Sequence, residues 1–314
     1  MVRACLLAMM SASACFAVSI APFYAGSYTV VLLGSAPGVS GPYGGINFLN
    51  GNLNTLLLGG LANQGGGVID QVGVTRDVNG HINGFTGVTS QLSTAPNIDG
   101  GLVYSPNGDL IYTGYPINTI GFIKPGSSSP DKTVGAPVSS SVGTLGFVPA
   151  GFTGAGNFVV GSYTGGTFCV ATLTPDGSGT YNVGACGASA SGFSGPEGIV
   201  WVPQGSALFP GQNVLVSEYQ SNRVSAYQVG ASGLPDPATR QDFVTGLSGA
   251  EGAVIDPVTG DFLFSTFGGG NQIIEVQGFA AAAAATPEPA GFVLIGAGVA
   301  LLLVGRLRLR RLAR

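Results

Sequence analysis

Charged residues are scarce in this 314-residue chain, where Asp, Glu, Lys and Arg together make up 8% of the sequence. The scarcity is uneven, because the body between residues 26 and 279 contains five basic residues and fourteen acidic ones. Nucleic-acid-binding proteins need a basic surface that neutralises phosphates, and this acidic body offers none. We therefore expect no nucleic-acid partner.

Histidine and cysteine are also rare, with one and four residues respectively. The single histidine, His81, lies in the turn-like stretch DVNGHINGF, where a solvated loop residue is expected. Serine and cysteine hydrolases need a histidine base beside the nucleophile, and zinc sites need several His or Cys ligands. The sequence also has no G-x-S-x-G nucleophile elbow. It therefore favours a protein without catalysis and predicts no catalytic residue, although it leaves an enzyme open.

Glycine and apolar residues are abundant, with 54 glycines and an apolar content of 45%. Disordered chains are usually polar and charged, so this composition argues against disorder. Many tight glycine turns joined by apolar strands would account for both numbers. We therefore expect a β-rich fold.

The amino-terminal stretch MVRACLLAMMSASACFAVSIA has one early arginine, an apolar run and the small residues Ala12-Ser13-Ala14. This order is typical of a secretory signal peptide, which we assign to residues 1–25. A buried amino-terminal helix is the alternative. Secretion would place the body in an oxidising compartment.

The carboxyl-terminal stretch combines an uncharged apolar run over residues 290–305 with an arginine-rich tail over residues 306–314. Sixteen apolar residues are slightly fewer than a membrane-spanning helix normally needs, but flanking arginines can compensate by reaching the interface. The arginines predict a cytoplasmic tail and an exported body. The proposed anchoring residues are Arg306, Arg308, Arg310 and Arg311.

Pro287-Glu288-Pro289 lies just before this apolar run, after an alanine-rich linker, and residues 280–289 form the linker and motif together. The order of PEP, apolar helix and arginine cluster resembles the PEP-CTERM sorting signal of bacterial surface proteins. The resemblance implies recognition by an exosortase, a membrane cysteine peptidase. It also implies a membrane-anchored intermediate that is then transferred to the cell surface or the extracellular matrix.

The body over residues 26–279 is a repeat of five glycine-anchored segments. Each has a short apolar strand, a turn rich in Pro, Asn, Asp and Gly, a second apolar strand, another turn and a third strand. The anchoring glycines are Gly45, Gly101, Gly146, Gly198 and Gly252. Looser strands such as RQDFVTGL would be the fourth, and SYTVVLLG at residues 27–34 would close the ring as the outer strand of the last unit.

The segments GPEGIVWVP at residue 195 and SNRV at residue 221 resemble the blades of NHL and gluconolactonase-like β-propellers. The resemblance implies an all-β propeller of four-stranded blades. Five blades are expected, with six as the alternative. A β-sandwich or a β-helix would not have repeats of this length and regularity.

Cys169 and Cys186 are the only cysteines of the body and lie on adjacent predicted strands around the turn PDGSG. We expect them to form a disulfide in an oxidising compartment, and two buried thiols are the alternative.

Three acidic residues, Asp99, Glu197 and Glu251, hold near-equivalent places just before the first strand of their blades. In gluconolactonase-like enzymes a glutamate at such a place joins asparagine and aspartate ligands around a divalent ion, typically calcium. Asn118, Asn222 and Asn271 follow the three acids at similar distances. We expect these residues to recur for structural reasons, in which case the protein has no cofactor, and a calcium site formed by the three acids is the alternative.

The leading hypothesis is an exported, surface-sorted β-propeller that binds a ligand or contributes to the extracellular matrix, with polysaccharide as a candidate ligand. The second hypothesis is a calcium-dependent lactonase or phosphoesterase of the gluconolactonase-like class. Fold alone does not separate the two, because propellers host unrelated functions.

Overall fold

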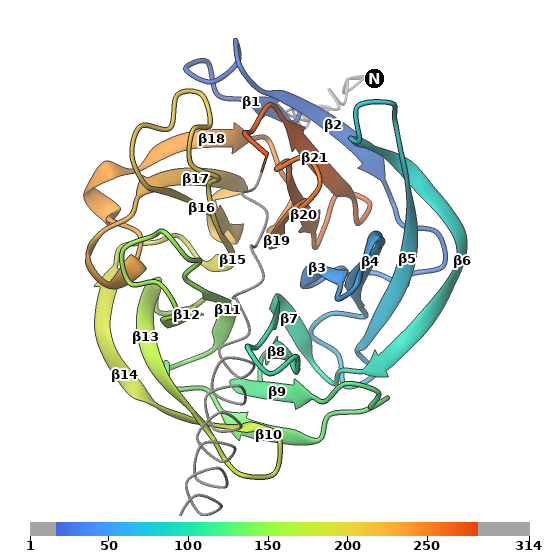
Figure 1. Cartoon of the computed structure of the whole chain (residues 1–314), viewed down its shortest axis with the longest axis vertical. Coiled ribbons are helices and arrows are strands. Elements are labelled where there is room, and N and C mark those ends of the chain that lie inside the picture. Colours follow the sequence, from blue (N-terminus) through green and yellow to red (C-terminus); the bar gives the residue numbers. More distant parts are fainter. Residues whose placement is uncertain (1–16, 282–314) are drawn as a thin grey trace, which may run out of the picture. The chain divides into compact units, whose positions relative to one another are not determined.

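Five antiparallel β-sheets surround a central axis in the computed structural model of the protein, which describes residues 17–281 (Figure 1). Each sheet is one blade of a propeller and has its first strand nearest the axis. The expected all-β propeller of four-stranded blades is confirmed, and the number of blades is five. The described residues contain almost no helix.

The four strands of each blade pair in an antiparallel order from the axis outward. In blades 1 and 2 they are β3 (Ile46–Leu49), β4 (Asn52–Gly60), β5 (Val68–Arg76), β6 (Ile82–Thr94), then β7 (Ile98–Tyr104), β8 (Leu110–Gly114), β9 (Thr119–Ile123) and β10 (Lys132–Gly135). In blade 3 they are β11 (Val142–Phe147), β12 (Phe158–Ser162), β13 (Thr167–Pro175) and β14 (Tyr181–Ser191). In blades 4 and 5 they are β15 (Pro196–Trp201), β16 (Asn213–Glu218), β17 (Arg223–Gln228), β18 (Gln241–Thr245), then β19 (Ala250–Ile255), β20 (Phe262–Thr266), β21 (Ile273–Gln277) and β2 (Thr29–Gly34).

The ring is closed by β2, which comes from the amino-terminal part of the chain and pairs with β21 from the carboxyl-terminal part. Val31 lies opposite Glu275 in this ladder. The pairing covers an edge that would otherwise expose unpaired backbone groups. The prediction that residues 27–34 form the outer strand of the last blade is therefore confirmed, as is the fourth strand β18 predicted from RQDFVTGL.

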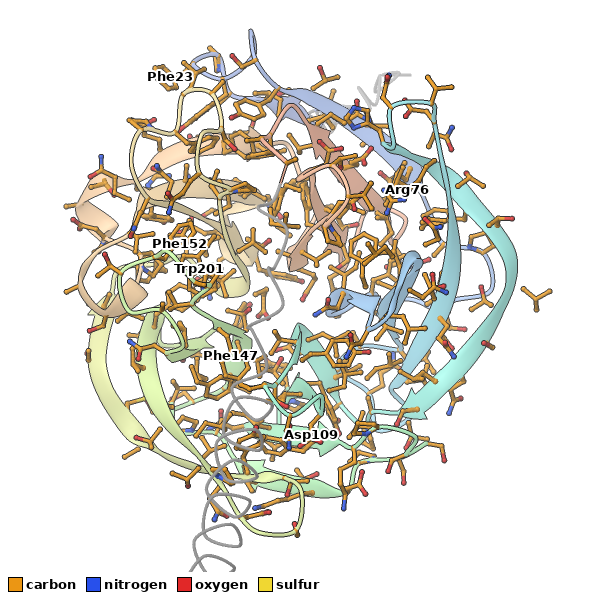
Figure 2. The ribbon with its side chains drawn as sticks, viewed as in Figure 1. Phe23, Arg76, Asp109, Phe147, Phe152 and Trp201 are labelled. Carbon is orange, nitrogen blue, oxygen red and sulfur yellow. A yellow bond between two sulfur atoms is a disulfide. The ribbon has the colours of Figure 1, made fainter. Side chains whose placement is uncertain are left out.

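A short strand, β1 (Ser19–Ile20), adds a fifth strand to blade 4 by pairing with β18. The residues after it pack into the propeller, because Ala21 and Tyr24 are buried in the apolar cluster between blades 4 and 5. Phe23, at the edge of the molecule in Figure 2, is 61% exposed. Propeller packing thus begins upstream of residue 26, while the extent of the signal peptide stays a prediction.

The apolar core is divided into five clusters, one at each junction between neighbouring blades. At the junction of blades 3 and 4, for example, Phe168, Trp201 and Tyr227 belong to one cluster, and Figure 2 labels Trp201. Burying one large apolar side chain contributes roughly 1.5–3 kcal/mol. Because each cluster draws on two blades, the blades stabilise one another around the ring.

Cys169 on β13 and Cys186 on β14 are diagonal neighbours across a register shift, since Cys169 lies opposite Ser189 and Ala171 opposite Cys186. Their Cα atoms are 5.5 Å apart and their sulfur atoms are joined as a disulfide in the structure. Its formation in the protein produced by cells stays a prediction. Peptide maps with and without reductant would test it, and two free thiols would contradict it.

Three short 3-10 turns complete the described chain: η1 (Tyr219–Ser221), η2 (Ala231–Gly233) and η3 (Pro237–Thr239). Over residues 17–281, no helix has the length and apolarity required to cross a membrane. Residues 1–16 and 282–314 lie outside the described residues, and they include the sorting motif at Pro287–Pro289, the apolar run over 290–305 and the arginine tail.

Candidate functional site

Each of the three predicted acids lies in a β-bulge at the beginning of an inner strand. The ladder between first and second strands shifts register between Ile98 and Leu102, between Pro196 and Gly198, and between Ala250 and Ala253. Such bulges redirect side chains that regular pairing would place on one face of a sheet. Asp99, Glu197 and Glu251 occupy these irregular positions in blades 2, 4 and 5.

The structure brings the three carboxylates together, with one oxygen from each lying within 4.8 Å of those of the other two. Asp99, Glu197 and Glu251 are 1%, 2% and 1% exposed. Asp99 Oδ2, Glu197 Oε2 and Glu251 Oε2 are buried and have no hydrogen-bond partner among the described residues. Buried acceptors without a partner cost free energy, so this cluster is a point where the fold leaves polar groups unsatisfied.

Glycines allow this close approach of the inner strands. A Cβ atom on Gly100 would lie 2.0 Å from the carbonyl oxygen of Glu197, although these residues belong to blades 2 and 4. In blade 3, Gly143 occupies the position that is acidic in blades 2, 4 and 5, and a Cβ atom on it would lie 2.8 Å from Glu197 Oε2. A side chain at either position would collide with the cluster. The backbone of the inner strands therefore forms a close-packed layer around the acids.

Burial raises the pKa of all three carboxyl groups well above their usual range. Repulsion from Asp99 and Glu251 raises the pKa of Glu197 further, and Asp99 also raises that of Glu251. Low-dielectric surroundings and like charges both penalise the ionised form, which explains the direction. A positive charge entering the cluster would oppose both effects and allow the carboxylates to ionise.

The acids line a pocket of about 170 Å³ at the end of the propeller axis where the inner strands begin, which we call the channel mouth. Its other lining residues are Asn63, Tyr115, Tyr163, Tyr219 and Phe267. Asn63 follows β4 in blade 1, has a left-handed backbone with φ of 63°, and its Oδ1 is also buried without a hydrogen-bond partner. Four unpartnered oxygens thus line one pocket, which is the set of donors that a hard cation takes.

The asparagines that follow the acids in sequence do not line this pocket. Asn118, Asn222 and Asn271 all have left-handed backbone conformations, which asparagine tolerates in turns. Asn118 Oδ1 accepts a hydrogen bond from Val142 N at 2.8 Å, and Asn222 Oδ1 accepts one from Gly249 N at 3.0 Å. These two residues therefore tie the turns of one blade to the inner strand of the next.

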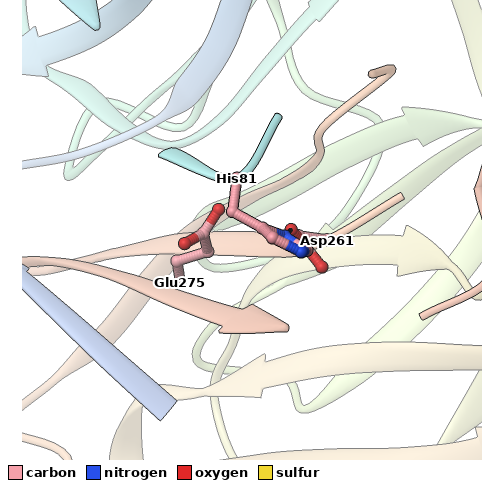
Figure 3. Close-up of side chains that lie close together, drawn as sticks. All are labelled: His81, Asp261 and Glu275. Carbon is pink, nitrogen blue, oxygen red and sulfur yellow. Dashed lines mark hydrogen bonds and ion pairs between the residues drawn. The ribbon is translucent and has the colours of Figure 1, made fainter. Parts of the chain in front are cut away.

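A second group of titratable residues, His81, Asp261 and Glu275, joins blade 1 to blade 5 (Figure 3). His81 is not the solvated loop residue expected from sequence, because its Nδ1 lies 2.5 Å from Asp261 Oδ2. This contact, followed by the nearby carboxylates, raises the pKa of His81 despite partial burial. Burial raises the pKa of Glu275 to about 7, and its Oε1 accepts a hydrogen bond from Ile82 N.

The same junction contains a buried ion pair between Arg76 of β5 and Asp256 in the turn between β19 and β20. Arg76 Nη1 lies 2.5 Å from Asp256 Oδ2 and Arg76 Nη2 lies 3.1 Å from Asp256 Oδ1. The guanidinium group also donates to the carbonyl oxygens of Leu53 and Gly80. We call Arg76, His81, Asp256, Asp261 and Glu275 the closing seam, since they connect the first and last blades.

Sequence reasoning selected the three acids of the pocket but missed Asn63 and the four aromatic residues. The aromatics had a visible signal, because each directly follows the second strand of its blade, in TGY, GSY, SEY and STF. Asn63 had none, because blade 1 matches the repeat least well and carries Leu61 where the other blades carry an aromatic. The fold and the cluster together define a five-bladed propeller with an acidic pocket near its axis.

No model of a known protein family matches the chain, and a comparison with curated proteins finds no match. Similar solved structures include a protein from Bacteroides fragilis provisionally named a 6-phosphogluconolactonase, with 10% identity over 79% of this chain and 77% of that chain and a TM-score of 0.45. A Bacteroides uniformis protein with the same provisional name has 12% identity over 79% and 78% of the two chains and a TM-score of 0.43. An auxiliary nutrient binding protein from Bacteroides thetaiotaomicron has 13% identity over 74% and 58% and a TM-score of 0.43. Similarity at such low sequence identity says nothing about function. The function must therefore be inferred from this chain's own residues.

Proposed function

We propose that the protein is a ligand-binding propeller that takes a positively charged group into the pocket formed by Asp99, Glu197 and Glu251. The observation that carries the proposal is the convergence of three buried carboxylate oxygens without hydrogen-bond partners. Water or protein donors satisfy nearly all such groups in folded proteins. A cation would supply the missing partner and would remove the repulsion among the acids.

A calcium ion is the simplest ligand of this kind, and the donor set fits it. Three carboxylates and the Asn63 amide oxygen would hold it, and calcium takes six to eight oxygen ligands in general, including water. A bound calcium ion would polarise the carbonyl of a lactone or the phosphoryl group of a phosphoester. This donor set is the specific observation that favours the second candidate function, a calcium-dependent lactonase or phosphoesterase.

Binding without catalysis remains the preferred function because the other residues that line the pocket offer no separate general base. They are Asn63, three tyrosines and Phe267. Burial is the largest cause that raises the pKa of Tyr163 and of Tyr219, and the nearby acids add to it. These phenols therefore stay protonated at neutral pH and are poor proton acceptors.

The thermal midpoint of the full-length protein in detergent, measured with excess calcium and then with a chelator, tests the proposal. A ligand at one hundred times its dissociation constant adds about 2.7 kcal/mol to the stability of the folded state, which is a shift of several degrees. We expect Glu251→Gln to abolish the calcium shift. Glu275→Gln, which removes a buried carboxylate of the closing seam, is the matched control and should retain it.

The outcomes separate the two candidate functions. A calcium shift that depends on Glu251, together with hydrolysis of a lactone or phosphoester that also depends on it, would favour the enzyme. A shift without hydrolysis would favour the binding protein. If neither calcium nor an organic cation changes the thermal midpoint or binds with dependence on the three acids, the cation pocket is wrong and the acids are structural.

We also propose that the protein is exported and sorted to the cell surface, where the propeller contacts polysaccharide or another matrix component. Support comes from the signal-like amino terminus and from Pro287-Glu288-Pro289 followed by the apolar run and arginines. Replacing Glu288 by Ala should retain the protein in the membrane fraction, whereas Glu275→Gln should leave sorting unchanged. Equal surface delivery of the Glu288→Ala variant would contradict exosortase-type recognition.

A further inference from the structure

Four aromatic side chains form an arc along the edge of the acidic pocket, which we call the rim. Tyr115, Tyr163, Tyr219 and Phe267 each directly follow the second strand of blades 2, 3, 4 and 5. Successive ring centroids are 5.8, 5.7 and 5.9 Å apart, with interplanar angles of 79°, 82° and 75°. Edge-to-face packing of this kind fixes the rings relative to one another. The three contacts therefore stabilise one arrangement of the four rings.

The rim and the acids form two layers of different chemistry. The acids are almost completely buried, whereas all four rim residues are half-buried and reach solvent. The pocket volume of about 170 Å³ compares with about 30 Å³ for one water molecule in the liquid. The space is thus larger than one ion needs, and its outer part is bounded by aromatic carbon. Such a site suits a ligand with a charged end and an apolar stem.

The charged end can be deduced from the acceptors at the bottom of the pocket. Three carboxylate oxygens, on Asp99, Glu197 and Glu251, lack hydrogen-bond partners, and these residues each offer an oxygen within 4.8 Å of the others. A primary ammonium group has three N–H donors and no acceptor, so its donors match the three oxygens in number and in kind. Hydrogen bonds between ionised partners are also the stronger ones. A quaternary ammonium group has no N–H and would leave the oxygens unsatisfied.

The aromatic rim adds a second attraction for the same kind of ligand. The faces of aromatic rings attract cations, and the methylene groups next to an ammonium nitrogen carry part of its charge. Phe267 offers no oxygen atom, so one side of the rim provides no ligand to a metal ion. The rim therefore favours an organic cation over a hydrated inorganic one.

We propose that the pocket at the channel mouth binds a primary ammonium group, with the nitrogen at Asp99, Glu197 and Glu251 and the adjoining carbon chain inside the rim of Tyr115, Tyr163, Tyr219 and Phe267. The proposal rests on the proposed function, because it specifies the class of cation that the pocket takes. An amino sugar of a polymer and a lysine side chain both present this group.

Isothermal titration of the full-length protein in detergent tests the proposal with four probes: butylammonium, tetramethylammonium, butanol and calcium chloride. We expect butylammonium to bind at least tenfold more tightly than tetramethylammonium, and butanol not to bind. Equal or tighter binding of tetramethylammonium would overturn the proposal, because the three N–H donors would then be unnecessary. If calcium binds and butylammonium does not, the proposal is overturned, but the proposed cation pocket is retained. If no cation binds, the proposal and the proposed function fail together.

Two variants separate the rim from the acids. Tyr163→Leu should weaken the affinity for butylammonium at least tenfold, because the rim would contact the organic ligand. If calcium binds, its affinity should change by no more than about twofold. Tyr104→Leu is the matched control, since Tyr104 lies at the opposite end of β7 from Asp99 and should change neither affinity. Equal butylammonium affinity in the wild type and in a folded Tyr163→Leu variant would overturn the role of the rim.

A second pair of titrations distinguishes the sources of the ammonium group. Glucosamine is compared with N-acetylglucosamine, and lysine amide acetylated at its α-amino group is compared with the form acetylated at both amino groups. Acetylation removes the charge and two of the N–H donors, so each acetylated control should lose binding. Tighter glucosamine binding would indicate an amino-sugar polymer, and tighter binding of the lysine derivative would indicate a protein partner. Binding of both acetylated controls at full strength would overturn the proposal.

Discussion

The propeller has two groups of buried carboxylates that differ in how their charge is compensated. At the closing seam, Asp256 receives both arms of the Arg76 guanidinium group and Asp261 lies against His81. At the channel mouth, one oxygen of each of Asp99, Glu197 and Glu251 has no hydrogen-bond partner, and no basic side chain of the described residues lines their pocket. The first group supplies its own cations, and the second would need one from outside.

This difference separates stability from function. Buried ion pairs that join distant parts of a chain hold a structure in one arrangement, although removing one partner is costly. Buried carboxylates without a partner do the reverse, since they destabilise the free protein and are relieved by a ligand. The seam residues come from blades 1 and 5, which meet where the ring closes. The three acids of the pocket come from the inner strands of blades 2, 4 and 5, which lie next to the axis.

Removing the cation of the seam should have the largest effect. Arg76→Met leaves Asp256, which is completely buried, without its counter-charge, and we expect a loss of about 3–5 kcal/mol in the free energy of unfolding. The thermal midpoint should fall by roughly 6–20 °C. Differential scanning calorimetry would measure the change.

Arg240→Met is the matched control for Arg76→Met. Arg240 Nη1 lies 2.6 Å from Asp242 Oδ1, but the two side chains are 37% and 43% exposed. Exposed pairs of this kind contribute about 0–1 kcal/mol. Equal effects of the two substitutions would show that the seam pair does not hold the ring closed.

Removing a charge from the channel mouth should have a smaller effect of opposite sign. In the ligand-free protein at pH 8, Glu251→Gln removes one of three repelling groups and gives Asp99 and Glu197 an amide donor. We expect a gain on the order of 1 kcal/mol in the free energy of unfolding, because the variant removes a buried acceptor that has no hydrogen-bond partner. Urea titration would measure it.

Glu218→Gln is the control with the same substitution in a compensated site. Glu218 is equally buried, but its oxygens accept hydrogen bonds from Ser225 at 2.6 Å, Tyr227 at 2.7 Å and Arg223 at 2.9 Å. These donors hold the pKa of Glu218 below its usual value although burial opposes them. Its replacement should destabilise the fold by about 1.5–3 kcal/mol. If Glu251→Gln destabilises to a similar extent, the comparison between the two kinds of carboxylate fails.

The fold could be predicted from sequence because its signals are local and repeated. Glycine anchors, turn residues and strand-length apolar runs recur in each unit, and they led to five blades and to ring closure by residues 27–34. The three acids were found for the same reason, since a repeat places equivalent residues at equivalent distances from the axis. Asn118 and Asn222 recur just as regularly, but their side chains connect a turn of one blade to the beginning of the next blade. Recurrence alone therefore does not separate a ligand from a structural residue.

Contacts between distant residues could not be predicted. His81 and Asp261 are 180 residues apart, as are Arg76 and Asp256, and no local pattern relates the members of these pairs. Asn63 enters the pocket because the loop after β4 adopts a left-handed turn, which depends on the surrounding blades. The unpartnered state of the carboxylate oxygens is likewise a property of packing. The proposed ligand site rests on this unpartnered state and not on the presence of acids alone.

The smallest effect should be a pH-dependent one at the seam. Contact with Asp261 raises the pKa of His81 above its usual value of 6.5, so the folded state holds this proton more tightly than the unfolded chain does. Its contribution to stability is complete below about pH 6.5 and is lost as pH rises through the folded-state value. His81→Gln keeps a neutral hydrogen-bonding group but removes the charge. We expect it to lower stability at pH 6 by no more than about 1 kcal/mol, since the side chain is 28% exposed, and to have almost no effect at pH 9.

The same pH series on Glu251→Gln sharpens the comparison between seam and pocket. The stability difference between this variant and the wild type should grow with pH, whereas that of His81→Gln should shrink. The wild-type carboxyl groups at the channel mouth have raised pKa values, so the folded state retains protons that the unfolded chain releases. Wild-type stability should therefore fall as pH rises above the unfolded-state values near 4. The advantage of Glu251→Gln should grow from pH 5 to pH 8, while the cost of His81→Gln shrinks from pH 6 to pH 9. Parallel profiles for the two variants would mean that the pocket carboxylates are compensated in the same way as those of the seam.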